Sequence, residues 1–162
     1  MRSRRDDPVT TEYTIRPARR SDVETLIAFT LAEAREAEGA QLELQGATRG
    51  VEAAFDTPPA ATYWVAEDPD GAVVASTSIV KEWSNFYGGY YWWIQSLFVS
   101  PSHRGHGIAE RLLTHVMSEA SANDALDLRL YAHESNERAL RVYRRCDFTI
   151  APYVILAHRS RR

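Results

Sequence analysis

The segment SLFVSPSHRGHGIAERLL, residues 96–113, constrains the fold more than any other part of this chain. An apolar run ends at Val99, glycines follow at positions 105 and 107, and apolar residues recur at helical spacing from Ile108 onward. A strand that leads directly into a helix predicts a βαβ unit, whose right-handed crossover places the helix N-terminus at the carboxyl edge of the strand. That terminus favours an anion, and Gly105 and Gly107 leave room for one to approach.

The N-terminal residues predict a strand followed by a long helix. Residues 13–18 are typical of a short first strand. Residues 19–39 predict a helix that Ser21 caps, with Glu24 completing a capping box and Gly39 lying just beyond the last turn.

The middle of the chain predicts a weak helix and then an antiparallel meander. The weak helix is expected over Thr48–Phe55, before two consecutive prolines. Two β-branched runs in residues 62–83 surround the turn signal Asp68–Gly71, which predicts a hairpin. Another turn at Gly88–Gly89 leads into the long strand that ends at Val99.

The C-terminal part continues the alternation of helices and strands. After the helix that begins at Ile108, we expect a strand in residues 125–133, a short helix in residues 135–146 and a closing strand in residues 147–159, interrupted at Pro152. The predicted fold class is therefore α/β (α+β): a mixed, mostly antiparallel central sheet flanked by helices, with a βαβ unit around the glycine turn.

Length and charge limit the function. The 162 residues fit one domain, expected over residues 12–158 between a flexible tail at 1–11 and a basic tail at 159–162. The net charge of −3 disfavours nucleic acid as a partner, and no apolar run is long enough to cross a membrane. A single cysteine, Cys146, and five histidines without a zinc motif predict no metal site, and together these features predict a cytoplasmic protein.

Three phosphate-binding motifs are candidates for the glycine turn. A P-loop requires a Gly-Lys pair, which does not follow Gly107. A dinucleotide fingerprint requires a third small residue where Glu110 stands, so a dinucleotide enzyme is the weaker alternative. The remaining pattern, Arg/Gln-x-x-Gly-x-Gly/Ala, is matched by Arg104, Gly107 and Ala109.

The runs IQSLFVSPSHRGHGIAERLL and SNERALRVYRRCDF together resemble the GCN5-related N-acetyltransferase (GNAT) superfamily, and the resemblance covers nearly the whole chain. It implies acetyl-coenzyme A (acetyl-CoA) as co-substrate. The pyrophosphate would lie on the glycine turn, and the pantetheine arm would pair with the end of the preceding strand. The implied cofactor-binding residues are Leu97, Phe98, Val99, Arg104, Gly105, His106, Gly107, Ile108 and Ala109.

A second family element is matched by Asn136, Ala139 and Tyr143, whose spacing puts them on one face of a helix. The resemblance implies that Asn136 contacts the pantetheine arm and that the Tyr143 hydroxyl protonates the departing thiolate. The alternative is that Tyr143 is a core aromatic residue with its hydroxyl at the rim. Cys146 departs from the family, which usually has a glycine there, so we expect this turn to be built differently. The thiol is expected to be inert packing.

The acceptor amine needs a base, and the strand before the glycine turn contains no carboxylate. Glu82 and Glu43 are substitutes by position only, and a solvated or structural carboxylate is the simpler explanation of each. The aromatic cluster around Glu82 contains Trp83, Tyr91 and Trp93. We expect part of this cluster to line an acceptor pocket, although strand packing is the simpler explanation of the aromatics.

The sequence therefore predicts an N-acetyltransferase that moves an acetyl group from acetyl-CoA to a primary amine of a small molecule, by direct transfer in a ternary complex. A non-catalytic acyl-CoA sensor and a protein or peptide N-acetyltransferase are the alternatives. Family members are often dimers, so the aromatic edge can equally serve a second copy in a homodimer.

Overall fold

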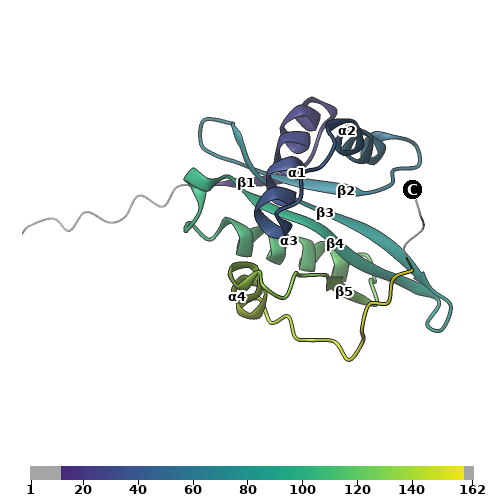
Figure 1. Cartoon of the computed structure of the whole chain (residues 1–162). Coiled ribbons are helices and arrows are strands. Elements are labelled where there is room, and N and C mark those ends of the chain that lie inside the picture. Colours follow the sequence, from purple (N-terminus) through teal and green to yellow (C-terminus); the bar gives the residue numbers. More distant parts are fainter. Residues whose placement is uncertain (1–11, 159–162) are drawn as a thin grey trace, which may run out of the picture.

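The computed structural model describes residues 12–158, which form one open sheet with helices on both faces (Figure 1). Neighbouring strands follow chain order, and the first four are antiparallel while the last pair is parallel. The strands are β1 (Thr14–Pro17), β2 (Thr62–Glu67), β3 (Val73–Ser84), β4 (Gly89–Val99) and β5 (Asp127–Leu130). The predicted mixed, mostly antiparallel fold class is confirmed.

The helices separate into two groups. Helices α1 and α2 cover one face of the sheet, whereas α3 covers the other and α4 lies beside α3 near β5 (Figure 1). Their bounds are α1 (Val23–Glu38), α2 (Leu44–Glu52), α3 (Ile108–Ala122) and α4 (Glu137–Arg145), with single 3₁₀ turns η1 (Arg20–Asp22), η2 (Ala53–Phe55) and η3 (Pro101–His103). Within residues 12–158, every helix is too short or too polar to cross a lipid bilayer.

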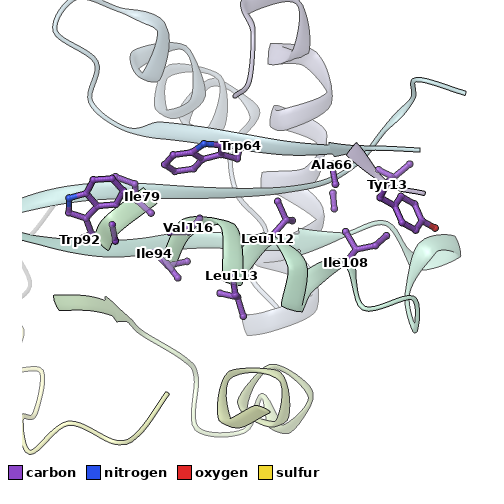
Figure 2. Close-up of a cluster of buried hydrophobic side chains, with 13 residues drawn as sticks. Tyr13, Trp64, Ala66, Ile79, Trp92, Ile94, Ile108, Leu112, Leu113 and Val116 are labelled. Atoms are coloured by element: carbon purple, nitrogen blue, oxygen red, sulfur yellow. The ribbon is translucent and has the colours of Figure 1, made fainter. Parts of the chain in front are cut away.

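The larger core lies between the sheet and α3. Trp64 and Ala66 alternate along β2 toward α3, while Val65 between them packs with Leu26 on the opposite face. Figure 2 shows the larger cluster gathered between the strands and α3. Within it, Trp64 and Trp92 stack with their ring centroids 6.4 Å apart. This core fixes the position of α3, and with it the glycine turn.

Strand β5 accompanies β4 for only part of its length. The parallel pairing runs from Tyr91 opposite Asp127 to Ile94 opposite Leu130, and β4 then continues alone on that side to Val99. The register between β3 and β4 also shifts at this point, as expected for a β-bulge. The last residues of β4 therefore present backbone groups that no neighbouring strand on the β5 side pairs.

Several local predictions are confirmed. Asp68 closes the β2–β3 hairpin by accepting the N–H groups of Asp70 and Ala72, and Gly71 adopts a left-handed φ of 83°. Gly39 ends α1 in the left-handed conformation, with φ 64°.

The predicted start of the first long helix is wrong. Ser21 lies inside η1, and the group that caps this turn is the carboxylate of Asp22, which accepts the backbone N–H of Arg19 at 2.7 Å. Asp22 is preferred because Arg16 on β1 also donates two hydrogen bonds to it, at 2.8 and 3.0 Å.

The helix predicted over Thr48–Phe55 begins earlier than expected, at Leu44. Its last turn is the 3₁₀ turn η2.

The closing strand predicted in residues 147–159 is also wrong over its described part. Residues 148–158 belong to no strand (Figure 1). The side chains of Ile150, Val154 and Leu156 are exposed. The apolar, β-branched composition explains the expectation, but a strand needs a neighbour in register. Pro152 has no N–H to donate, and the ring of Tyr153 lies 5.9 Å from the guanidinium of Arg129 without any strand pairing.

We expect Asp22→Asn to lower the free energy of unfolding by about 1–3 kcal/mol at neutral pH, because Arg16 loses the charge of a buried partner. The hydrogen bonds from Arg16 hold the pKa of Asp22 below its usual value. This stabilisation is therefore complete above the ordinary aspartate pKa and is lost as the pH falls through the lower folded-state pKa.

Urea unfolding at neutral and acidic pH measures this effect. The difference between Asp22→Asn and the parent protein should shrink in acid, and Glu52→Gln, an exposed carboxylate of α2, serves as the control. A deficit of the same size at both pH values would contradict the assignment.

Candidate functional site

One cleft of about 920 Å³ opens where β4 has left β5, between α1, the N-terminus of α3 and α4. Every residue predicted to bind acetyl-CoA lines it except His106. Its lining consists of Glu33, Glu36, Ala37, Leu97, Phe98, Val99, His103, Arg104, Gly105, Gly107, Ile108, Ala109, Glu110, Ser135, Asn136, Glu137, Arg138, Ala139, Val142, Tyr143 and Arg145.

The floor at one end of the cleft is the glycine turn before α3. Gly105 and Gly107 have φ values of 81° and 72°, which other residues rarely adopt, and an added Cβ at either would meet no atom within 4 Å. Gly107 caps α3, so the first N–H groups of that helix have no acceptor within it. The turn therefore offers donors and a partial positive charge to an anion in the cleft.

His106 is not one of the residues that line the cleft. Its Nδ1 lies 3.2 Å from the carbonyl oxygen of His103, and its ring packs edge-on against Tyr13 at 6.3 Å between centroids. The backbone of His106 is part of the glycine turn, whereas its side chain packs against Tyr13.

Two arginines at the same end of the cleft share one carboxylate. Arg104 on the glycine turn donates to Glu36 of α1 at 2.7 Å, and Arg138 of α4 lies 3.3 Å from the same oxygen. Glu36 thus partners two guanidinium groups, which are side chains of the kind that bind phosphate.

At the end of β4, where no strand pairs with it on the β5 side, side chains bond to the backbone instead. The Leu97 N–H donates to Oε1 of Glu33 at 2.9 Å, and the Val99 carbonyl accepts a hydrogen bond from Nε of Arg104 at 2.9 Å. These are backbone groups that a pantetheine arm lying along β4 would use. Side chains therefore satisfy the strand end in the absence of a neighbouring strand.

Helix α4 forms the opposite wall. Asn136 caps the helix by accepting the Ala139 N–H at 3.2 Å, and Ala139 and Tyr143 follow along the cleft. Burial, together with the negative charge of Glu33, raises the pKa of Tyr143 to about 12. Tyr143 therefore keeps its proton throughout the neutral range.

The turn after α4 forms without the glycine that the family usually has at position 146. Cys146 has an ordinary φ of −100°, and the left-handed position has moved one residue on to Asp147, with φ 63°. Aspartate tolerates this conformation better than most residues. The Phe148 N–H then bonds the Tyr143 carbonyl at 3.1 Å, which anchors the end of α4.

The residues predicted for the acceptor lie outside the cleft lining. Tyr91 and Trp93 lie on the sheet face opposite Trp92, and Glu82 pairs with Tyr91 across the β3–β4 ladder. Trp83 on β3 pairs with Tyr90 on β4 and so shares its face of the sheet. Tyr90 is three positions before Trp93 on the same strand, so Trp83 and Trp93 lie on opposite faces and cannot share a pocket. The structure therefore divides the predicted aromatic set between two faces.

The two carboxylates predicted as bases are also outside the cleft. Glu82 is exposed on β3 and Glu43 is exposed before α2. The carboxylates that sequence reasoning missed are Glu33 and Glu36, three residues apart on α1. Their spacing puts them on one helix face, but this pattern is equally typical of a solvated face, so the sequence alone could not select them.

Comparison with protein families identifies the class. The family model described as acetyltransferase (GNAT) family matches residues 25–148. The chain belongs to this family, and the resemblance of its motifs is confirmed. Among curated proteins, the comparison finds no significant match.

Solved structures agree with the family. A possible acetyltransferase from Clostridium difficile 630 is 28% identical, with a TM-score of 0.85 and coverage of 93% of this chain and 99% of that one. Two others, each 19% identical, show the same fold. A predicted acetyltransferase with acetyl-CoA from Clostridium acetobutylicum has a TM-score of 0.75 (91% and 96% covered), and ribosomal-protein-alanine N-acetyltransferase from Brucella melitensis biovar Abortus 2308 has 0.73 (92% and 100%).

Glycine substitutions at positions 146 and 147 test the geometry of the turn after α4. Asp147→Gly should raise the free energy of unfolding by about 0.5 kcal/mol, because glycine adopts a positive φ without strain. Cys146→Gly should lower it by about 0.5–1 kcal/mol, because φ at that position is ordinary, so the unfolded chain gains flexibility, and the packing of the Cys146 side chain against the core is lost. Urea unfolding of both variants measures the difference, and the reverse order would contradict this turn.

Proposed function

We propose that this protein is an N-acetyltransferase that moves an acetyl group from acetyl-CoA to a primary amine of a small molecule, by direct transfer in a ternary complex. The observation that carries the proposal is that the glycine turn, the unpaired end of β4 and Tyr143 line one cleft. The solved relative that contains acetyl-CoA has this fold.

The cleft can hold acetyl-CoA along its length. The diphosphate would lie on the N-terminus of α3 near Arg104 and Arg138, and the pantetheine arm would follow β4. The thioester would then reach the region between Leu97 and Tyr143. Most of the rate enhancement would come from holding amine and thioester together.

Tyr143 would serve as the acid. The amine nitrogen attacks the thioester carbonyl carbon, the carbon–sulfur bond breaks, and the thiolate of coenzyme A takes the hydroxyl proton of Tyr143. The high pKa of Tyr143 guarantees that this proton is present, and solvent restores it after the product leaves.

A small acceptor with an aromatic or apolar part would fit the half-buried aromatic groups on the α1 side of the sheet. Trp93 stacks on Tyr131 at 4.5 Å between centroids, and Arg129 lies 3.5 Å from the centroid of the Tyr91 ring. The guanidinium suggests an acceptor that also carries a negative or electron-rich group.

Ligand binding and turnover test the proposal in sequence. Acetyl-CoA, but not NAD or ATP, should raise the thermal unfolding midpoint, with about 2.7 kcal/mol available at a hundredfold excess over Kd. Turnover is then measured with tyramine, spermidine and a peptide that begins with alanine, and tyramine should react fastest. Tyr143→Phe should lower kcat about a hundredfold and leave the Kd for acetyl-CoA unchanged.

The outcomes separate the alternatives. Binding of acetyl-CoA without turnover of any amine would favour the acyl-CoA sensor, and preference for the peptide would favour a peptide N-acetyltransferase. An unchanged kcat in Tyr143→Phe would remove the acid assignment. No binding would overturn the whole proposal.

Glu36 offers a second test of the diphosphate position. If the diphosphate replaces Glu36 between Arg104 and Arg138, Glu36→Gln should tighten acetyl-CoA binding about two- to fivefold, because the competing carboxylate is gone. Calorimetric titration measures Kd, with Glu24→Gln on the same helix as the control. Weaker binding in Glu36→Gln would mean that Glu36 is needed to hold the arginines.

A further inference from the structure

A buried tyrosine at the edge of the sheet holds a histidine of the cleft. Tyr13, which directly precedes β1, is 4% exposed and belongs to the larger core. Its hydroxyl oxygen lies 3.2 Å from Nδ1 of His103, the last residue of η3, and the two rings meet edge to face with their centroids 6.0 Å apart. His103 in turn lines the cleft beside Arg104 and the glycine turn.

The core sets the position of the Tyr13 hydroxyl. Figure 2 shows Tyr13 beside Ile108, at the end of the buried cluster where α3 begins. The backbone carbonyl of Tyr13 also accepts a hydrogen bond from Nη2 of Arg111 on α3, at 2.6 Å. Because packing and the backbone both hold Tyr13, its hydroxyl fixes the orientation of the His103 ring.

The contact with Tyr13 leaves one nitrogen of the imidazole for a ligand. A phenol hydroxyl can donate to Nδ1 of a neutral ring and accept from Nδ1 of a charged ring, so the pair persists in both protonation states. In each of these arrangements Nε2 carries a hydrogen. Nε2 of His103 has no hydrogen-bond partner among residues 12–158, so the cleft contains a donor that this part of the protein does not use.

The arginines at the same end of the cleft are already paired. Arg104 and Arg138 share the carboxylate of Glu36, at 2.7 and 3.3 Å. A phosphate group that binds these arginines must compete with that carboxylate. It can approach Nε2 of His103 without displacing a partner from the described residues.

A second histidine on the turn lacks these properties. His106 is exposed, lies outside the cleft lining and has its Nδ1 at the carbonyl oxygen of His103. The titratable and charged groups around His103 come from the start of β1, the turn, α1 and α3, and they are Tyr13, His106, Arg104, Glu36 and Arg111.

We propose that Nε2 of His103 binds a phosphate group of the acyl donor, and that Tyr13 is the positioning residue for this contact. The inference rests on the proposed use of acetyl-CoA and adds a dependence on pH. Imidazole changes its charge between about pH 5 and 8, and the charged ring makes a stronger, charge-assisted hydrogen bond to an anion. The contribution of His103 to acetyl-CoA binding is therefore larger at the acid end of that range.

Proton uptake follows from the same coupling. A phosphate oxygen beside Nε2 stabilises the imidazolium, so some of the molecules that are neutral at His103 before binding become protonated as the donor binds. By reciprocity, protonation of His103 favours the donor by the same factor. A histidine with a purely structural role would produce neither effect.

Calorimetric titration of the full chain with acetyl-CoA at pH 6 and pH 8 measures both effects. His103→Gln keeps an N–H donor near the position of Nε2 but carries no charge, so it should raise Kd about tenfold at pH 6 and less than about twofold at pH 8. Titration in buffers of different ionisation enthalpy gives the proton uptake, which should be lower in His103→Gln than in the parent protein. His158→Gln, at an exposed histidine outside the cleft, is the matched control and should behave as the parent does.

Tyr13→Phe tests the positioning role, because it keeps the buried ring and removes only the hydroxyl. It should raise Kd at pH 6 about threefold, since the His103 ring loses the contact that orients it. Thermal unfolding without ligand establishes that each variant is folded. An unchanged Kd in folded Tyr13→Phe would overturn the role of Tyr13.

Acetyl-CoA that lacks the 3′-phosphate locates the contact. An effect of His103→Gln that persists with this donor assigns the contact to the diphosphate, and an effect that disappears assigns it to the 3′-phosphate; both results support the proposal.

Two patterns would overturn the role of His103 while leaving the proposed acetyl transfer intact. One is an equal Kd for His103→Gln and the parent protein at pH 6. The other is a loss of affinity of the same size at both pH values with unchanged proton uptake, which indicates a structural role. Failure of the parent protein to bind acetyl-CoA would remove both proposals.

Discussion

The backbone groups at the end of β4 are the constraint on which the cleft depends. Because β5 pairs with β4 only as far as Ile94, the donors and acceptors beyond that residue must find other partners. Glu33 and Arg104 supply them, from a helix and a turn that arrive from opposite sides of the strand. These side-chain bonds keep the strand end satisfied without a neighbouring strand.

The rest of the cleft follows from how α3 is held. Its buried side chains, among them Leu112 and Val116, fix the helix against the sheet, so the glycine turn has a defined position at the end of β4. Positive charge from that helix terminus and from Arg104 is balanced by carboxylates of α1. The balance keeps the charges partnered within the protein.

Local signals in the sequence predicted much of the fold. Asp68 and Gly71 specify a hairpin turn and Gly39 ends a helix, because each satisfies a backbone requirement within a few residues. The misplaced cap at Ser21 and the missing closing strand have the opposite origin. Arg16 on another element selects Asp22, and a strand forms only where a neighbour in register accepts it.

The residues of the candidate site also separate into those that local sequence predicts and those that depend on tertiary packing. The sequence by itself determined the glycine turn, the helix that follows it and the spacing of Asn136 and Tyr143, because these depend on residue type at adjacent positions. Only the tertiary structure decided that Glu33 accepts the Leu97 N–H and that Trp83 and Trp93 lie on opposite faces of the sheet. Which polar face of a helix reaches which strand end is set by the packing of the whole core, and no local pattern records it.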